Sequence, residues 1–149
     1  MARENATREH RQFDTLLEMK DAGLVAASAA ATVGGSAKIL DLGEGLVDAD
    51  LLIEVTAVEV DTGDEIYQIG FQLSSEADFA STIKEAATLK LGDAAALPGD
   101  VDMDAGRYIL GVRNEVAGTK YRYARLYTTV AGTIATGINF TARLAKRTP

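Results

Sequence analysis

Apolar and polar residues alternate along several stretches of the chain, most regularly near its end. From Ile138 to Leu144 every second residue is apolar, and the residues between them are polar or charged. Successive side chains of a β-strand point to opposite faces, so this period of two predicts a strand with one buried face. The expected inward set is Ile138, Phe140, Ala142 and Leu144.

Similar runs elsewhere predict about eight short strands separated by turn residues. The expected strands include Ser36–Leu42, Leu51–Val60, Tyr67–Leu73, Glu85–Leu91 and Tyr121–Val130. In the second of these, the apolar face shifts by one residue near Ala57 and Val58, which predicts a bulge or a bend. The third strand would point Tyr67, Ile69, Phe71 and Leu73 inward.

Glycine-containing breaks at 117–119 and 131–133 divide the stretch from Arg107 to Ala145 into three runs. A parallel return requires a crossover of a dozen or more residues, whereas antiparallel neighbours are joined by short turns. We therefore predict that this stretch forms an antiparallel meander against which the rest of the chain packs.

Longer polar or glycine-rich segments at 43–50, 74–84 and 92–106 predict loops that cross between layers rather than tight hairpins. Many short strands with crossing connections are typical of sandwiches and barrels. We therefore predict an all-β fold over residues 21–149: a single antiparallel β-sandwich of about eight strands, with the jelly roll as its topology.

Residues 1–20 differ from the remainder, because they are rich in Arg and Glu and contain no Gly or Pro. Phe13, Leu16 and Leu17 form an apolar edge at helical spacing, but so short a helix is marginal in water. We predict an N-terminal arm, partly helical or extended, that becomes ordered on a partner, because these side chains are unfavourable when exposed. The alternative is a frayed terminus.

The composition fits one globular domain, with 149 residues of which 47% are hydrophobic. No apolar run approaches the roughly 20 residues that cross a bilayer, so we expect no membrane partner. The Ala-rich stretch from Leu24 to Ala31 lacks the length and the following cleavage site of a secretory signal.

The net charge of −7 is distributed unevenly. Residues 21–112 carry four basic side chains against seventeen carboxylates, whereas residues 113–149 carry seven basic side chains against Glu115 alone. The acidic body argues against nucleic acid as a partner, because phosphate binding needs a basic surface. The basic end indicates either cross-strand ion pairs with the acidic body or a patch that faces a partner.

The residues that usually carry catalysis are scarce. There is no cysteine, and the single histidine, His10, lies in the charged terminal segment. Nucleophile–histidine machinery is therefore improbable, and we expect no enzyme activity, no catalytic residue and no cofactor. Asp61-Thr62-Gly63 matches the tripeptide of aspartic proteases, but Asp64 and Glu65 follow it and an ordinary turn between two hairpin strands explains it better.

Asp100, Asp102 and Asp104 resemble the start of a calcium loop. An EF-hand has glycine at its sixth position and glutamate at its twelfth, where this chain has Ala105 and Gly111. We therefore expect a solvated acidic loop and no metal site, with a weak surface cation site as the alternative.

A row of tyrosines and one arginine is the clearest candidate binding feature. Tyr121, Tyr123, Arg125 and Tyr127 share one face of the expected strand, opposite Leu126. Tyr and Arg are enriched at protein interfaces and among their hot spots, so this row predicts a protein interface. The alternative is a ladder that stiffens the sheet or is covered inside the sandwich.

Three stretches together resemble the jelly-roll capsid cement, or decoration, proteins of tailed bacteriophages. They are SAAATVGGSAKILDLGEG (28–45), IGFQLSSEADFAS (69–81) and RLYTTVAGTIATGINFTARL (125–144). They occur in the order of that family, and the resemblance as a whole spans about residues 13–145. The longer charged amino terminus and the segment 111–124 depart from the family, so contacts made there cannot be carried over.

The resemblance implies a non-enzymatic virion protein that is made in the host cytoplasm and binds the outer surface of the capsid. Its expected partners are the major capsid protein and itself, as a homo-oligomer (a dimer or a trimer). The expected effect is to cement neighbouring capsid subunits and stabilise the mature shell. The alternative is a carbohydrate- or receptor-binding jelly-roll module of a virion, against which the absence of Trp argues.

Overall fold

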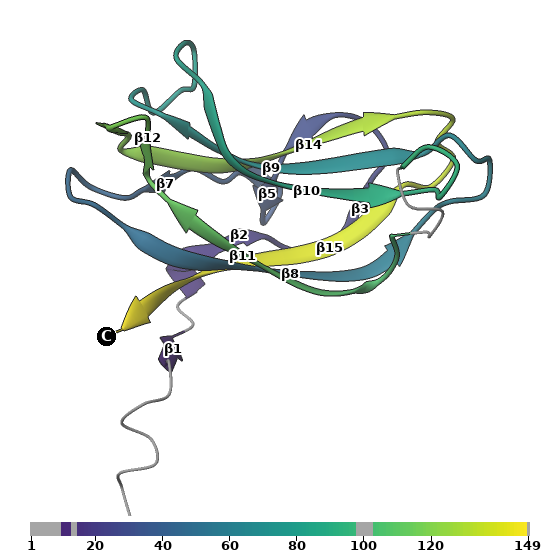
Figure 1. Ribbon diagram of the computed structural model, residues 1–149, viewed down its shortest axis with the longest axis horizontal. Coiled ribbons are helices and arrows are strands. Elements are labelled where there is room, and N and C mark those ends of the chain that lie inside the picture. Colours follow the sequence, from purple (N-terminus) through teal and green to yellow (C-terminus); the bar gives the residue numbers. More distant parts are fainter. Residues whose placement is uncertain (1–9, 13–14, 98–102, 149) are drawn as a thin grey trace, which may run out of the picture.

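Two antiparallel sheets pack face to face in the computed structural model, and most of the long strands run along the long axis of the molecule (Figure 1). The structure describes residues 10–12, 15–97 and 103–148. The all-β, antiparallel sandwich predicted from the alternating pattern is confirmed.

The first sheet has the order β1-β15-β8-β11, and β2 and β3 also pair with β15. Its members are β1 (His10–Gln12), β2 (Glu18–Lys20), β3 (Leu24–Val25), β8 (Asp48–Val58), β11 (Gly106–Arg113) and β15 (Ile138–Thr148). In Figure 1 it is the lower layer. Its longest strands, β8 and β15, lie side by side at its centre.

The second sheet has the order β10-β9-β14-β4, and β7 also pairs with β14. Its members are β4 (Ala29–Ala30), β7 (Leu40–Asp41), β9 (Ile66–Ser74), β10 (Lys84–Gly92) and β14 (Tyr123–Ala131). Two small hairpins lie outside these sheets, β5 (Thr32–Val33) with β6 (Ser36–Ala37) and β12 (Glu115–Val116) with β13 (Thr119–Lys120).

The core lies between the sheets and includes the inward residues that the alternation predicts. Ile138, Phe140, Ala142 and Leu144 of β15 are all buried. Tyr67, Ile69, Phe71 and Leu73 of β9 face them and are buried as well. Both predicted inward sets are therefore confirmed, because the period of two decides which face of a strand leaves water.

The predicted irregularity in β8 is a bulge. The pairing of β15 with β8 passes from Asn139 opposite Ala57 to Phe140 opposite Val55, so Thr56 has no partner on β15. The bulge lies one residue before the predicted position, and it explains why the apolar pattern of the strand shifts by one residue.

The predicted C-terminal meander is wrong. β11 and β15 both pair with β8 in the first sheet, whereas β14 pairs with β9 in the second. Likewise β8 and β9, which were expected to form a hairpin across the turn at 61–64, lie in opposite sheets. The link between β14 and β15 comprises residues 132–137. Six extended residues span up to about 20 Å, which exceeds the ~10 Å between packed sheets, so a short link can also cross from one sheet to the other.

The predicted arm of residues 1–20 also needs correction. β2 pairs with β15, and Met19 is completely buried in the core. The segment before it, Thr15–Leu17, is a single 3-10 turn (η2) rather than an α-helix. The sandwich therefore begins before residue 21, because β15 needs a partner along its outer edge and Met19 fills the core beneath it.

Candidate protein interface

The outward face of the second sheet carries the predicted Tyr–Arg row. Tyr123, Arg125 and Tyr127 of β14 are partly exposed, and they alternate with residues such as Ala124 and Leu126 that are fully buried. The β-sheet register places Arg125 opposite Gln72 of β9 and Tyr127 opposite Gly70. The structure thus brings three of the four predicted residues of this row together.

Arg125 is the centre of the row. Its Cζ lies 4.4 Å from the centroid of the Phe79 ring and 5.3 Å from the centroid of the Tyr127 ring. Its Nε donates a hydrogen bond of 2.9 Å to Oε1 of Gln72. Partial burial lowers the pKa of Arg125, which still leaves it a cation at neutral pH. Two aromatic rings and one amide therefore hold this guanidinium in place.

Phe79 is the residue that the sequence pattern did not connect to this site. It lies in the loop between β9 and β10, is buried, and has a φ of 53°, a value unusual for a non-glycine residue. A single aromatic residue in a polar loop indicates an anchor, which the burial of Phe79 shows it to be. Nothing in the local pattern indicates that it anchors the loop against Arg125 of a distant strand.

The neighbouring part of this face belongs to Glu85 of β10. Oε1 of Glu85 accepts hydrogen bonds from Nε2 of Gln68 at 3.0 Å and from Oγ1 of Thr88 at 2.5 Å. The carboxylate lies over Gly70, where a Cβ would come within 2.7 Å of its Cδ. A glycine is therefore required at position 70 for Glu85 to lie flat on the sheet.

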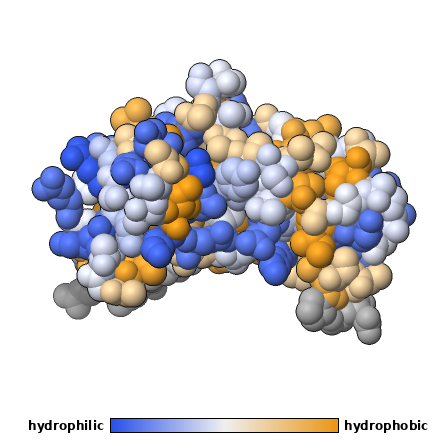
Figure 2. Space-filling view, turned by 90° about the horizontal axis from the view of Figure 1, so that it is seen from above, coloured by the Kyte–Doolittle hydropathy of each residue, from blue (hydrophilic) through white to orange (hydrophobic). Residues whose placement is uncertain are grey.

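Polar and apolar side chains both contribute to this side of the molecule. Figure 2 shows it from above, with apolar side chains in separate groups among polar ones. An interface of this composition would resemble non-obligate protein interfaces, in which aromatic residues and Arg lie within a polar surround.

Tyr121, the fourth residue predicted for the row, lies elsewhere. It precedes β14, is only 7% exposed and packs in the hydrophobic core. Its backbone N–H donates to the carbonyl oxygen of Asn114, which anchors it at the base of the β12–β13 hairpin. The strand begins at Tyr123, so the alternation cannot be extended back to Tyr121, and its assignment to the exposed row is wrong.

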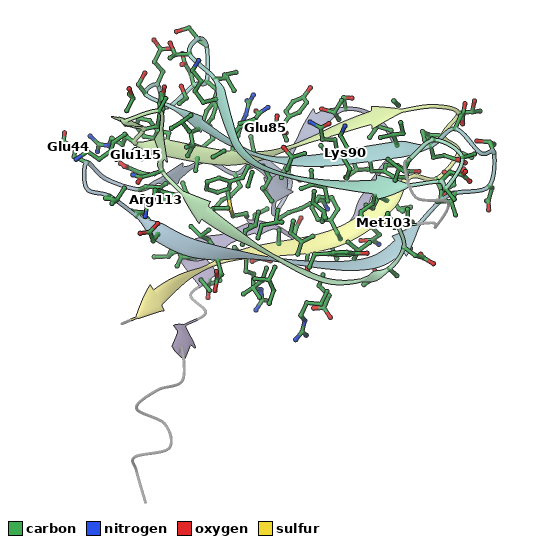
Figure 3. All side chains as sticks on the ribbon, viewed as in Figure 1. Glu44, Glu85, Lys90, Met103, Arg113 and Glu115 are labelled. Carbon is green, nitrogen blue, oxygen red and sulfur yellow. The ribbon has the colours of Figure 1, made fainter. Side chains whose placement is uncertain are left out.

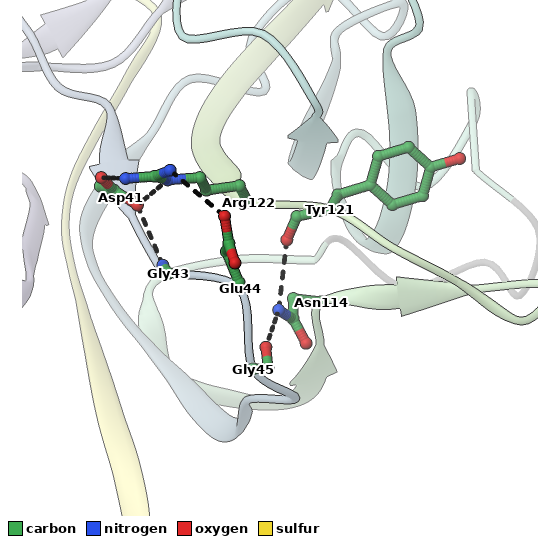
Figure 4. Close-up of polar contacts among 7 residues, drawn as sticks. All are labelled: Asp41, Gly43, Glu44, Gly45, Asn114, Tyr121 and Arg122. Atoms are coloured by element: carbon green, nitrogen blue, oxygen red, sulfur yellow. Dashed lines mark hydrogen bonds and ion pairs between the residues drawn. The ribbon is translucent and has the colours of Figure 1, made fainter.

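Asn114 connects three segments at this end of the sandwich (Figure 4). Its Nδ2 donates to the carbonyl oxygens of Gly45 at 2.8 Å and Tyr121 at 3.2 Å, and its Oδ1 accepts from the N–H of Val47. Asn114 is only 1% exposed, so these bonds satisfy a polar side chain that would otherwise be unfavourable in the interior.

Arg122 lies beside the hydrogen bonds of Asn114 and forms an ion pair with Asp41 on the surface. Its Nε and Nη2 donate to the two oxygens of Asp41 at 2.8 and 2.9 Å, and Glu44 lies 3.9 Å from its Nη1 (Figure 4). The guanidinium of Arg122, together with the N–H of Gly43, lowers the pKa of Asp41 to about 2. The pair is solvent-exposed, so its contribution to stability is small.

Arg113 forms a similar pair with Asp48, with a Nε–Oδ1 distance of 2.7 Å. In Figure 3, Arg113, Glu115 and Glu44 gather at one end of the sandwich, and Met103 lies at the other. For Arg113 and Arg122, the basic end of the chain therefore makes cross-strand ion pairs with the acidic body. Arg125 makes none with the described residues, so for it the partner-facing alternative stays open.

The three residues predicted for the arm are separated. Phe13 lies outside the described residues. Leu16 is 73% exposed in η2, and Leu17 packs partly buried against the core. Of the two that the structure describes, Leu16 is therefore the one that presents its side chain to solvent.

The turn with the protease-like tripeptide is fastened by its own carboxylates. Glu65 is completely buried, and it accepts hydrogen bonds from the backbone N–H groups of Thr62, Gly63 and Asp64. These bonds and the Thr62 hydroxyl overcome the opposing effect of burial and lower the pKa of Glu65 to about 2. Asp61 stays exposed in the turn.

Glu59 and Asp64 hold the neighbouring loop 132–137 in the same way. Glu59 accepts hydrogen bonds from the N–H groups of Ala135, Thr136 and Gly137, which lower its pKa. Asp64 accepts from the N–H and the hydroxyl of Thr133, and its pKa is lowered by these bonds. The three carboxylates thus tie together the loops at this end of the sandwich.

Of the acidic loop, Asp100 and Asp102 lie outside the described residues. Asp104 accepts a hydrogen bond from the N–H of Ala105, and its carbonyl accepts one from the Tyr108 hydroxyl. Within the described residues, no group of three or more His, Cys, Asp or Glu side chains could hold a metal ion. None of their helices is long and apolar enough to cross a membrane.

Comparison with models of known protein families gives no match for this chain, and comparison with curated proteins gives no significant match.

Proposed function

We propose that this chain is a structural virion protein that binds the outside of a phage head and cements neighbouring major capsid protein subunits. It does so as a homo-oligomer without catalysis. The observation that carries the proposal is that strands from all three stretches that resemble cement proteins meet around β14 in the second sheet.

Those stretches are far apart in sequence but adjacent in space. The first, 28–45, contains β4 and β7. β4 pairs with β14 inside the third stretch, 125–144, and β7 pairs with the two residues of β14 just before that stretch. The second, 69–81, begins in β9, which pairs with β14 on the other side. Chance similarities in unrelated surface loops would have no reason to meet, so this arrangement supports a common architecture.

The strand order supports the jelly-roll form of the sandwich. One sheet reads β2 or β3, then β15, β8 and β11, and the other reads β4 or β7, then β14, β9 and β10. Successive long strands mostly alternate between the sheets, and the first and last strands are neighbours. Folding a long antiparallel hairpin over itself, as in a jelly roll, produces an order of this kind, so the strand order supports the proposed topology.

The mechanism follows from repetition. Each copy in an oligomer touches a different capsid subunit, so individually weak contacts add through effective concentration. The partly exposed residues of the row, Tyr123, Arg125 and Tyr127, supply one contact surface. The acidic body is compatible with the outer surface of a shell whose interior holds DNA, because like charges repel.

The test is co-sedimentation of the purified protein with expanded heads of its own phage assembled without it. Saturable binding at a fixed ratio to the major capsid protein, with heads that then resist heat or denaturant better, is the expected result. A lack of binding to heads in every maturation state would contradict the proposal.

The row is tested in the same assay with Tyr123→Ala. We expect weaker binding, because the substitution removes a partly exposed aromatic ring from the contact surface. Thr129→Ala, an exposed change on the same strand, is the matched control. Unchanged oligomeric state and unchanged head affinity in Tyr123→Ala would remove the main support for this interface.

The arm is tested with a truncation that ends at residue 14, because Met19 belongs to the core. We expect the shortened protein to fold and to bind heads more weakly. Head binding equal to that of the full chain would show that this segment makes no contact with a partner.

The second candidate function is a carbohydrate-binding module of a virion. The observation that favours it is the pair of partly exposed rings, Tyr123 and Tyr127, on either side of Arg125, because sugars stack on aromatic faces. Glycan-array binding without head binding would establish this function in place of the first.

A further inference from the structure

We infer that Arg125 is the receptor for a single carboxylate, supplied by an Asp or Glu side chain of the partner protein on the shell. The inference rests on the proposed function, and it identifies the chemistry that the row recognises. Two observations support it: side chains of the same chain hold the guanidinium in place, and among the described residues the guanidinium has no anionic partner.

The guanidinium is held before any partner arrives. Phe79 lies 4.4 Å and Tyr127 5.3 Å from its Cζ, and its Nε is bound to Gln72 at 2.9 Å. An ordinary surface arginine loses considerable side-chain freedom when it is bound, whereas this one has already lost it on folding. Fixed arginines next to aromatic rings are typical binding hot spots.

The guanidinium lacks an anionic partner. Among the described residues, no acceptor binds its terminal Nη atoms and no carboxylate lies within ion-pair distance. Arg113 and Arg122, by contrast, each donate two hydrogen bonds to one aspartate. The Nη side of Arg125 therefore has donors for a carboxylate that the chain itself does not provide.

The carboxylate of Glu85, on the strand beyond Gln72, is bound to other groups. The register places Glu85 opposite Gln72, and Gln72 opposite Arg125, so the neutral amide lies between the two charges. Glu85 is bound instead to Gln68 and Thr88 and rests on Gly70. This arrangement leaves the charge of Arg125 available to a partner.

The surroundings select a carboxylate on a protein. A polyanion such as nucleic acid would be repelled by a chain whose net charge is −7, whereas one carboxylate matches one guanidinium. The carboxylate of an acidic sugar has the same chemistry. However, the rings of Phe79 and Tyr127 already pack against Arg125, and Phe79 is buried, so they offer little surface for a sugar ring.

The experiment measures the affinity of full-length variants for heads assembled without this protein. Arg125→Gln removes the charge, Arg125→Lys keeps the charge but loses the planar fork, and Arg143→Gln is an exposed control with the same change in net charge. We expect at least a tenfold loss of affinity for Arg125→Gln, a smaller loss for Arg125→Lys, and a change of less than twofold for Arg143→Gln.

Salt dependence distinguishes ion pairing from a structural role. Wild-type affinity should fall more steeply with salt than that of Arg125→Gln, while both proteins keep the same oligomeric state. If Arg125→Gln does not fold, the affinity of Arg125→Lys for heads tests the inference, because this variant preserves the charge and most of the packing. An affinity equal to that of wild type would then overturn the inference.

The outcomes separate the two claims. If wild type binds heads and both Arg125 variants bind as tightly with the same salt dependence, the inference is overturned and the proposed function stands. If wild type fails to bind heads, the proposed function is wrong, and the inferred partner on the shell is excluded as well. Binding of sialyl-lactose by wild type that is lost in Arg125→Gln would overturn the protein carboxylate in favour of an acidic glycan.

Discussion

Lys20 and Phe140 join β2 to the last strand, β15, through two contacts at once. Nζ of Lys20 donates a hydrogen bond of 3.0 Å to the carbonyl oxygen of Phe140 and lies 4.6 Å from the centroid of its ring. The same ammonium donates to the carbonyl oxygens of Asp21 and Gly23. Lys20 is only 4% exposed, and burial lowers its pKa. Three carbonyls therefore replace the water that a lysine normally keeps.

Lys20→Met should destabilise the fold by about 1–3 kcal/mol, because the thioether cannot donate to the carbonyl groups beneath it. Equilibrium unfolding in urea measures the loss. Lys84→Met, at an exposed position at the start of β10, is the control and should change the free energy of unfolding by less than about 0.5 kcal/mol. Equal stability of the two variants would show that the contacts of Lys20 contribute nothing net.

Met19→Ala should lower the free energy of unfolding by about 2–5 kcal/mol, since it leaves a cavity between the sheets. Leu16→Ala also truncates an apolar side chain, but one that is 73% exposed, so the free energy of unfolding should change by less than about 0.5 kcal/mol. Chemical denaturation of the two variants provides the comparison. A small effect of Met19→Ala would mean that residues 18–20 do not belong to the cooperative fold.

Stability should fall as the pH drops below about 4.3, the ordinary value for a glutamate, and continue to fall towards pH 2. The folded-state pKa values of Glu59, Asp64 and Glu65 are lowered, that of Glu65 to about 2. A lowered folded pKa contributes stability that is complete above the unfolded value and is lost as the carboxylates become protonated. Thermal unfolding between pH 6 and pH 2 measures this dependence.

Glu65→Gln should flatten that profile and lower Tm at pH 6, because a neutral amide is a weaker acceptor for the three N–H groups of the turn. Asp61→Asn, an exposed change in the same turn, is the control and should keep the wild-type profile. A Glu65→Gln profile as steep as that of wild type would assign the acid sensitivity to other groups.

Gly132→Ala should destabilise the protein by more than about 1–3 kcal/mol, the range expected for backbone strain alone. Gly132 has a φ of 97°, and a Cβ there would lie 2.2 Å from the carbonyl oxygen of Asp64. Gly34→Ala is the matched control, since its φ of 60° is also positive but the space around it is open. Urea unfolding should rank Gly132→Ala as clearly less stable than Gly34→Ala, and the opposite ranking would contradict the close approach.

Alternation in the sequence placed three of the four predicted residues of the Tyr–Arg row correctly. Tyr123, Arg125 and Tyr127 could be placed on one face because they lie within a continuous strand. Tyr121 could not, because the chain bends before Tyr123 to follow Asn114, whose partners lie in other loops. The contact of Phe79 with Arg125 could not be predicted from the local pattern either, since the two residues are 46 positions apart in the sequence.

By itself, the sequence determined where the long strands lie and which face of each of them is buried. Alternation is a local property, because each side chain of a strand points away from its neighbour whatever the strand pairs with. The buried sets of β9 and β15 and the bulge in β8 followed from it.

Only the tertiary structure decided which strands are neighbours. Backbone hydrogen bonds between strands are the same for every sequence, and a short link can either turn within a sheet or cross to the other. The predicted meander therefore became strands of two different sheets. Met19 was drawn into the core for the same reason, since the partner of β2 is the last strand of the chain, a choice made by packing rather than by local pattern.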